Sequence, residues 1–225
     1  MRGMEKLSLI FTRIAVAKQQ FIEFLLAVTT YYKNTRFAKI DLYLLSRYWL
    51  RNPYRIARRY LQQRGDQDLY TYGETPLTTI HLIAVKAGIS PDDTVLELGC
   101  GRGRTCFWLR EWLGCRVVGI EQVPTFVETA NQVKERFRVT GVDFVLGDYL
   151  QADWGTPTVI YLYASNLDEG TIALLAKKIA SLKHPVRVIS VSFPIPGLDV
   201  KRQFVLPFTW GDADVYVGRG VGQLD

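Results

Sequence analysis

Apolar residues recur at three- and four-residue spacing through the first 65 residues. In the first run, Leu7 to Val28, this spacing places the apolar side chains on one face of a helix. A second run, about Arg36 to Leu50, is rich in Leu, Tyr and Trp, and Pro53 opens a third helix that reaches about Arg64. We therefore expect residues 1–65 to form a helical N-terminal extension and residues 66–225 to form the main domain.

From about residue 75, short apolar runs alternate with helical segments. Strands are expected at 94–98, 116–120, 142–146, 158–163 and 186–193, with a final hairpin of 203–208 and 214–217 around Trp210-Gly211-Asp212. Helices are expected at 76–87, 103–113, 124–139 and 168–182. This order predicts an α/β fold: a seven-stranded, doubly wound, mostly parallel sheet whose last pair is antiparallel.

Charge is divided unevenly between the two segments. Residues 1–65 hold 13 Lys/Arg and 3 Asp/Glu, whereas the other 160 residues hold 15 Lys/Arg and 19 Asp/Glu. Arg13, Lys18 and Glu23 interrupt the best candidate for a membrane span, which needs roughly 20 apolar residues. We expect an unprocessed cytoplasmic chain, either free or peripheral at a membrane surface.

The basic segment Arg47–Tyr60 interleaves arginines with aromatic residues. Such a segment can bind nucleic acid, an anionic membrane surface or an acidic protein. It can equally be a helical cap whose arginines are simply solvated.

The cysteine and histidine content gives no sign of a metal site. Three cysteines, at 100, 106 and 115, form no C-x-x-C pair, and the only histidines are His81 and His184. No metal is therefore expected.

The strand Thr94–Leu98 runs into Gly99-x-Gly101-x-Gly103. Glycines at such a turn allow close approach of the backbone to a ligand, and the following helix offers free N–H groups. The spacing differs from the G-x-G-x-x-G of dinucleotide sites, and no P-loop lysine follows. Glu97 would repel a pyrophosphate but could pair with a ligand ammonium.

With its acidic-x-Gly-x-Gly-x-Gly pattern, Glu97–Gly103 resembles the class I S-adenosylmethionine (SAM) methyltransferases. The resemblance makes Glu97, Gly99, Cys100, Gly101 and Gly103 cofactor-binding residues. Glu121, after the second strand, can accept hydrogen bonds from both ribose hydroxyls. By the same resemblance, Asp148 would contact the adenine amine and Tyr149 would pack against the ring.

A narrower resemblance lies in Tyr72-Gly-Glu-Thr75, Gly147-Asp-Tyr-Leu150 and the strand Val159–Tyr163. These segments are similar to the non-SET histone-lysine methyltransferases of the disruptor-of-telomeric-silencing type. The resemblance implies that the loop with Tyr72, Glu74 and Thr75 closes over the methionine part of SAM and shapes the lysine channel.

The family's Asn-Asn pair near the transferred methyl is missing here, because Tyr163 and Ala164 stand in those places. Asn166 is a candidate for the amide's role, and Tyr163 and Tyr72 are candidates for lining the channel. Tyr70, Phe193 and Trp210 are further possible walls, with Trp210 better explained as a core aromatic.

The resulting expectation is SAM-dependent methylation of a lysine in a protein substrate. Positioning of nucleophile and methyl supplies much of the rate for an activated sulfonium, and desolvation in an aromatic channel helps the amine lose its proton. The alternatives are methylation of RNA or a small molecule, and a binding module that has lost catalysis.

Overall fold

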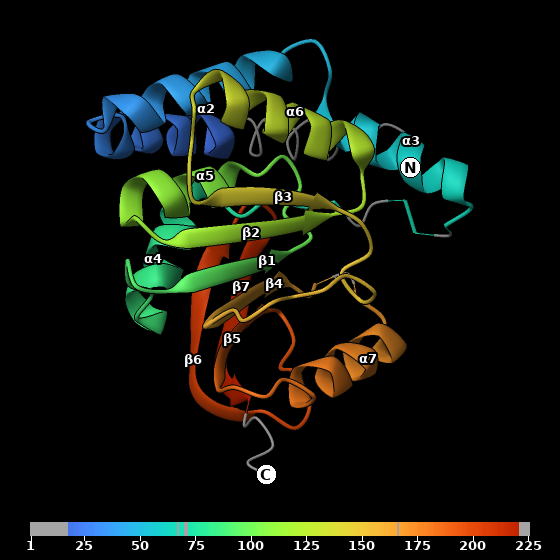
Figure 1. Ribbon diagram of the computed structural model, residues 1–225. Coiled ribbons are helices and arrows are strands. Elements are labelled where there is room, and N and C mark those ends of the chain that lie inside the picture. The colour runs from blue at the N-terminus through green and yellow to red at the C-terminus, as the bar shows by residue number, and fades with distance from the viewer. Residues whose placement is uncertain (1–17, 67, 70–71, 166, 221–225) are drawn as a thin grey trace, which may run out of the picture.

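In the part of the chain that the structure describes, a seven-stranded sheet has the order β3-β2-β1-β4-β5-β7-β6 (Figure 1). The computed structural model describes residues 18–66, 68–69, 72–165 and 167–220. The strands are β1 (Thr94–Leu98), β2 (Arg116–Glu121), β3 (Val142–Leu146), β4 (Val159–Tyr163), β5 (Val186–Val191), β6 (Asp199–Phe208) and β7 (Gly211–Gly220). Strands β1 to β5 pair in parallel, and β7 is antiparallel to β5 and β6. The predicted fold class is confirmed.

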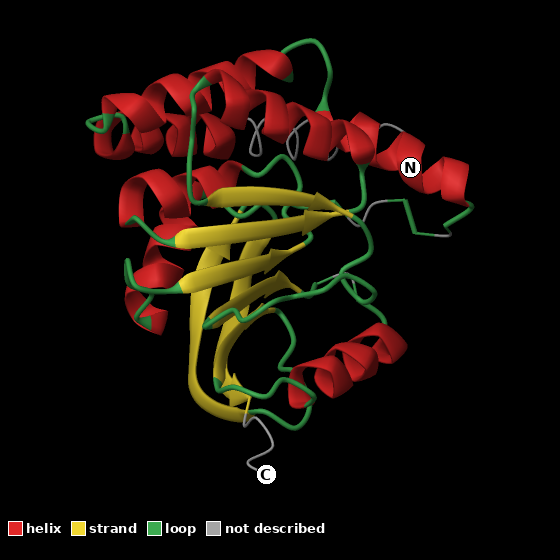
Figure 2. Ribbon diagram, in the orientation of Figure 1, coloured by secondary structure: helices red, strands yellow, loops and turns green. Residues whose placement is uncertain are grey.

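Helices cover both faces of this sheet (Figure 2). They are α2 (Thr35–Arg47), α3 (Pro53–Arg64), α4 (Leu77–Ala87), α5 (Arg104–Trp108), α6 (Pro124–Arg136) and α7 (Glu169–Ala180), and residues 18–31 are also helical. Side chains alternate along β1, so that Val95 packs in the layer with α4, α5 and α6. Leu96 and Leu98 pack in the other layer with Leu175 and Ile179 of α7. The alternation expected of a strand covered on both faces is therefore present.

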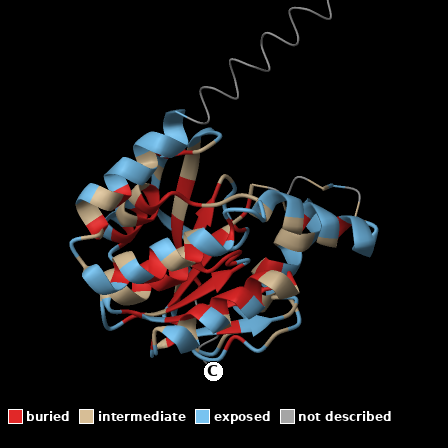
Figure 3. Cartoon of the chain, turned by 90° about the horizontal axis from the view of Figure 1, so that it is seen from above, coloured by how far each residue is buried: buried red, intermediate tan, exposed pale blue. Residues whose placement is uncertain are grey.

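The N-terminal helices belong to the first of these layers. Phe37, Ile40 and Leu44 of α2 are fully buried in the same cluster as Trp108. Figure 3 shows buried and exposed positions along the helices. Tyr31 packs edge-to-face against Trp108, with ring centroids 5.5 Å apart. Burial of these apolar side chains stabilises the packing of the N-terminal helices on the sheet. The expected division at residue 65 stays a prediction.

Local sequence signals set the limits of these helices. The side chain of Asn34 caps α2 by accepting from the Phe37 N–H at 3.0 Å. Asn52 caps α3, Pro53 occupies its first turn, and Gly65 ends it with φ of 80°. None of the described helices is long and apolar enough to cross a membrane.

Two predicted elements differ in extent from those observed. The hairpin strands β6 and β7 are longer than the predicted 203–208 and 214–217, and Gly211 begins β7 instead of lying in the turn. The predicted helix 103–113 is α-helical only as far as Trp108 and continues as a π-helical turn, Leu109–Leu113. The apolar pattern does not distinguish these helical forms.

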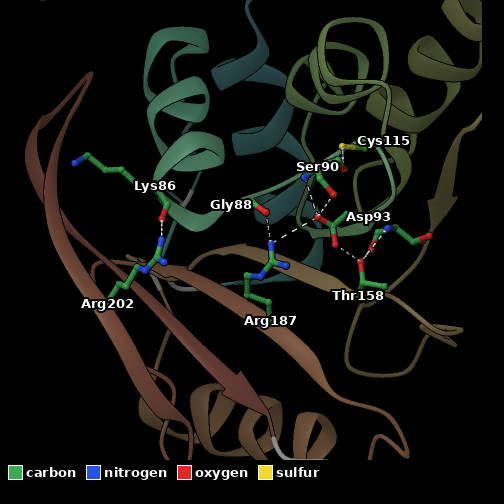
Figure 4. A network of polar contacts seen from close by, with 9 residues as sticks. Lys86, Gly88, Ser90, Asp93, Cys115, Thr158, Arg187 and Arg202 are labelled. Atoms are coloured by element: carbon green, nitrogen blue, oxygen red, sulfur yellow. Dashed lines mark hydrogen bonds and ion pairs between the residues drawn. The ribbon is translucent and has the colours of Figure 1, made fainter.

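A polar network fastens the amino-terminal ends of the parallel strands (Figure 4). Asp93, just before β1, accepts hydrogen bonds from the Thr158 hydroxyl at 2.7 Å and the Ser90 N–H at 2.8 Å. Arg187 of β5 lies 3.6 Å from the Asp93 carboxylate and donates to the Gly88 carbonyl. The glycine turn lies at the opposite, carboxyl-terminal ends of these strands.

Candidate active site

The glycine turn lies where the strand order reverses. The chain runs outward from β1 to β2 and β3 and then crosses back to β4, which lies beside β1. Ligands of open α/β sheets bind at such a switch point. Gly101 has φ of 54°, and an ideal Cβ at Gly103 would lie 2.3 Å from the Phe144 ring. Both positions therefore require glycine.

Glu121 supports this turn from the end of β2. Its Oε2 accepts the Gly101 N–H at 2.8 Å and its Oε1 accepts the Val123 N–H at 2.9 Å. Burial raises the pKa of the Glu121 carboxyl despite these hydrogen bonds. Each carboxylate oxygen has a further lone pair, so both remain able to accept from a ligand hydroxyl.

Glu97 is a buried carboxyl with no cation in contact among the described residues. The Thr105 hydroxyl lies 2.5 and 2.7 Å from its two oxygens, and the Cys106 thiol lies 3.0 Å from Oε2. Burial raises the pKa of Glu97 to about 7. A buried carboxylate is normally paired, and Glu97 is able to pair with a ligand ammonium.

Two adjoining cavities surround the turn. The larger, about 470 Å³, is bordered by Glu121 and Tyr149, and the smaller, about 30 Å³, by Glu97, Cys100 and Thr75. Gly73, Leu98, Gly99 and Tyr163 border both. The larger volume falls in the range of nucleotide-sized ligand sites. These residues fit SAM. Glu97 is able to pair with its ammonium, the glycine turn allows close approach of the backbone, and Glu121 is able to accept from its ribose hydroxyls.

Glu74 and Thr75 of the loop border the smaller cavity, and Tyr72 borders the larger one. Closure of this loop over the methionine part of SAM stays a prediction. Glu74 forms a bidentate ion pair with Arg102, in which the Arg102 Nε donates at 2.6 Å, and Tyr72 donates its hydroxyl to the same carboxylate. Burial disfavours ionisation of Glu74, but Arg102 outweighs it and lowers its pKa. Thr75 and Tyr161 share a 2.5 Å hydrogen bond. Glu74 thus fixes the loop through Arg102, a pair that sequence reasoning missed.

Tyr163 lies at the junction of the two cavities. An ideal Cβ on Gly73 would be 3.0 Å from the Tyr163 hydroxyl, and the Tyr163 ring packs edge-to-face on Trp210 at 4.8 Å. Trp210 and Phe193 are 45% and 47% exposed, so the interpretation of Trp210 as a core aromatic is wrong. Its place in the β6–β7 turn exposes it.

The remaining candidates are placed less directly. Tyr149 borders the larger cavity, whereas Asp148 is exposed, does not border the cavity, and accepts the Leu150 N–H at 2.8 Å. Ala164, in place of the family's asparagine, is fully buried. Asn166 and Tyr70 lie outside the described residues.

One wall of the larger cavity comes from the N-terminal extension. Ala57, Leu61 and Arg64 of α3 border it, followed by Asp66 and Asp68. These residues were missed because no local motif marks them. Their role follows only from the docking of α3 beside the sheet.

Comparison with known proteins agrees with this geometry. The family model described as the ANTKMT methyltransferase domain matches residues 97–202. The protein-lysine N-methyltransferase of Saccharolobus islandicus is 30% identical over 134 residues, which cover 58% of this chain and 81% of that protein. A solved RNA methyltransferase from Salinibacter ruber, in complex with S-adenosyl-L-homocysteine, aligns with a TM-score of 0.58 and 27% identity, covering 68% of this chain and 96% of that one.

A further similarity is confined to part of a longer protein. The sterol 24-C-methyltransferase of Saccharomyces cerevisiae is 32% identical over 85 residues, 37% of this chain, and the match spans 22% of that enzyme. These relatives are all named methyltransferases. The chain belongs to the class I SAM-dependent methyltransferases, and SAM is its cofactor.

Proposed function

We propose that this methyltransferase acts on the side-chain amine of a lysine in a protein substrate. The observation that carries the proposal is the setting of Tyr163, at the junction of the two cavities and against the exposed Trp210. The aromatic ring of Tyr163 at that junction suits a long apolar stem that ends in an amine. The S. islandicus relative, named a protein-lysine N-methyltransferase, supports the same substrate class.

We assign the cofactor contacts as the sequence predicted. Glu97 takes the ammonium, Glu121 the ribose hydroxyls, and Tyr149 the adenine ring. Asp148, next to Tyr149, is assigned to the adenine amine, and its exposed carboxylate has one oxygen without a hydrogen bond among the described residues. The backbone from Gly99 to Gly103 provides the cradle.

The chemistry asks the protein chiefly to position and desolvate an amine. Bound SAM supplies an activated methyl group on a sulfonium. Tyr163 and Trp210 offer apolar ring surface, which disfavours the lysine ammonium, so that its proton passes to solvent. The neutral nitrogen then attacks: the new N–C bond forms as the S–C bond breaks, and the methylated amine sheds its extra proton to water.

Three residues are proposed to shape this step. Tyr163 directs the amine at the cavity junction, and Tyr72 borders the larger cavity while its hydroxyl holds Glu74. Asn166 is proposed for the amide role that Ala164 cannot take. Tyr163 ends β4 and Ala164 follows it, at the end of the sheet where the glycine turn lies.

RNA methylation is the second candidate, supported by the S. ruber enzyme. The carboxylates at the larger cavity, Asp66, Asp68 and Asp168, oppose a polyanionic substrate there. A cytoplasmic chain, free or peripheral at a membrane, remains our proposal for location.

The experiment that tests the function is transfer of labelled methyl from SAM to a cell lysate, followed by separate protease and nuclease digestion. Label that is lost with protease and kept with nuclease supports a protein substrate. Label lost only with nuclease would replace it by RNA. SAM binding with no label in any fraction would favour a non-catalytic binding module.

A further inference from the structure

A second concave surface lies on the outer side of α3. This groove, about 550 Å³, runs between α3 and the start of α6. Its charged lining consists of Arg51, Arg55 and Arg59, and no Asp or Glu of the described chain borders it. We call it the arginine groove.

The three guanidinium groups of the arginine groove are available to a partner. Arg51, Arg55 and Arg59 are exposed, and in the described part of the chain none of their side chains has a hydrogen bond or ion pair to another residue. By contrast, Arg102 and Arg104 near the glycine turn are both paired with carboxylates. The groove therefore presents positive charge that the fold itself does not neutralise.

The spacing and rim of the groove suit a polypeptide. Arg55 and Arg59 are one turn apart on α3, about 6 Å along the helix axis. Alternate residues of an extended peptide repeat at about 6.6 Å, so two acidic side chains on one face of a peptide match the two arginines. Beyond Arg51, Trp49 and Leu50 are 86% and 92% exposed and offer apolar contact.

The groove and the cofactor cavity share a wall. Ala57, Leu61 and Arg64 on the other side of α3 border the larger cavity, and Val123 borders both spaces. The two sites are thus separated by about one helix diameter, roughly 10 Å. An occupant of the groove lies within reach of the site of methyl transfer.

The two sites have opposite charge. The charged residues at the larger cavity are four carboxylates and one arginine, namely Asp66, Asp68, Glu121, Asp168 and Arg64, whereas those at the groove are Arg51, Arg55 and Arg59. RNA or an anionic membrane carries one sign throughout and would meet carboxylates at the cavity. A polypeptide can present both signs at this distance.

We propose that the arginine groove binds an acidic segment of the protein substrate while the target lysine enters the cavity. This inference rests on the proposed function and adds a charge pattern to its substrate: a lysine with an acidic stretch a few residues away. The groove would then select among lysines that the cavity alone accepts equally.

The test uses the full chain and fluorescein-labelled octaglutamate as the probe, followed by fluorescence anisotropy. The groove variant is Arg51→Gln/Arg55→Gln/Arg59→Gln. Its matched control is Arg116→Gln/Lys177→Gln/Lys183→Gln, which removes the same charge from exposed positions outside the groove. We expect the groove variant to bind the peptide about tenfold more weakly, and the control to bind with nearly wild-type affinity. Equal weakening in both variants would overturn the proposal, as would Arg-dependent binding of phosphatidylserine vesicles or an RNA oligomer in preference to octaglutamate.

Methyl transfer to lysate protein separates this inference from the proposed function. Calorimetry with SAM first checks that the groove variant keeps its cofactor affinity. We then expect a fall of about tenfold in protein labelling by the groove variant, and competition of wild-type labelling by octaglutamate. Unchanged labelling by the groove variant would overturn the role of the arginine groove and leave the proposed function in place. No protein labelling by the wild type would overturn the proposed function.

Discussion

The guanidinium of Arg104 donates hydrogen bonds of 2.7 and 2.8 Å to the two carboxylate oxygens of Asp41. Arg104 begins α5, directly after the glycine turn, and Asp41 lies in α2, where it is 1% exposed and also accepts from the Tyr32 hydroxyl at 3.0 Å. Burial disfavours ionisation of Asp41, but Arg104 outweighs it and lowers its pKa. The N-terminal helices are thus joined to the cofactor turn by a buried ion pair.

Replacement of Asp41 by Asn is expected to destabilise the fold by about 3–5 kcal/mol, because it leaves Arg104 buried and unpaired. Denaturant unfolding measures this loss. Because the pKa of Asp41 is lowered by folding, its contribution is present above pH about 4 and is lost as the pH falls below that value. The control, Asp143→Asn, breaks an exposed pair with Lys134 and should cost at most about 1 kcal/mol. Equal losses in the two variants would contradict the role given to Asp41.

Cofactor affinity is expected to depend on the ionisation of Glu97. With a pKa of about 7, its carboxyl is mostly protonated at pH 6 and mostly ionised at pH 7.5. Binding of S-adenosylhomocysteine, measured by calorimetry, should therefore strengthen several-fold across this range, and Glu97→Gln should remove the dependence. The apo protein should show the opposite trend: stability falls as the pH rises from about 4.5 to 7, because the folded state holds the proton more tightly. A wild-type affinity that is flat with pH would refute the pairing of Glu97 with the ammonium.

Gly73→Ala is expected to disturb the cavity junction, since its Cβ would lie 3.0 Å from the Tyr163 hydroxyl and 3.2 Å from the ring. We predict about a tenfold loss of S-adenosylhomocysteine affinity, and recovery of most of it in Gly73→Ala/Tyr163→Leu, where the ring is gone. Gly147→Ala is the control, because nothing lies within 4 Å of its Cβ. If the two substitutions have additive effects on the free energy of S-adenosylhomocysteine binding, a clash between the new Cβ and Tyr163 is not the cause of the loss.

Lys178 is expected to hold the loop that carries Tyr149. Its Nζ donates to the carbonyls of Tyr149, Leu150 and Ala152 at 3.1, 2.8 and 2.6 Å. Lys178→Met should cost about 1–3 kcal/mol in unfolding free energy and also weaken cofactor binding. Lys177→Met, at the exposed neighbouring position, should change neither quantity. A Lys178→Met protein with wild-type stability and wild-type cofactor affinity would contradict the role of Lys178 in holding this loop.

The sequence predicted the parts of the site that are local in the chain. The strand, the glycine turn and Glu121 follow one another within 30 residues, so periodicity and glycine spacing were enough to place them. The structure confirms that a glycine turn joins β1 to a helix. The roles of these residues toward SAM remain predictions.

What the sequence did not predict is held together by contacts between distant segments. Glu74 with Arg102 and Asp41 with Arg104 pair residues 28 and 63 positions apart. In neither pair does a sequence motif around one residue identify the other as its partner. Trp210 was misassigned for a related reason, since an aromatic residue in a hairpin turn resembles a core residue in composition and only the register of β6 and β7 exposes it.

The most direct measurement of the central claim is identification of the methylated residue itself. Lysate protein labelled by the enzyme from methyl-labelled SAM is hydrolysed to amino acids, and these are separated by chromatography beside methylated standards. We predict that the label elutes with ε-N-methyllysines and that Glu97→Gln reduces it strongly. Label in a methylated arginine, histidine or glutamine, or in nucleosides alone, would contradict methylation of a lysine.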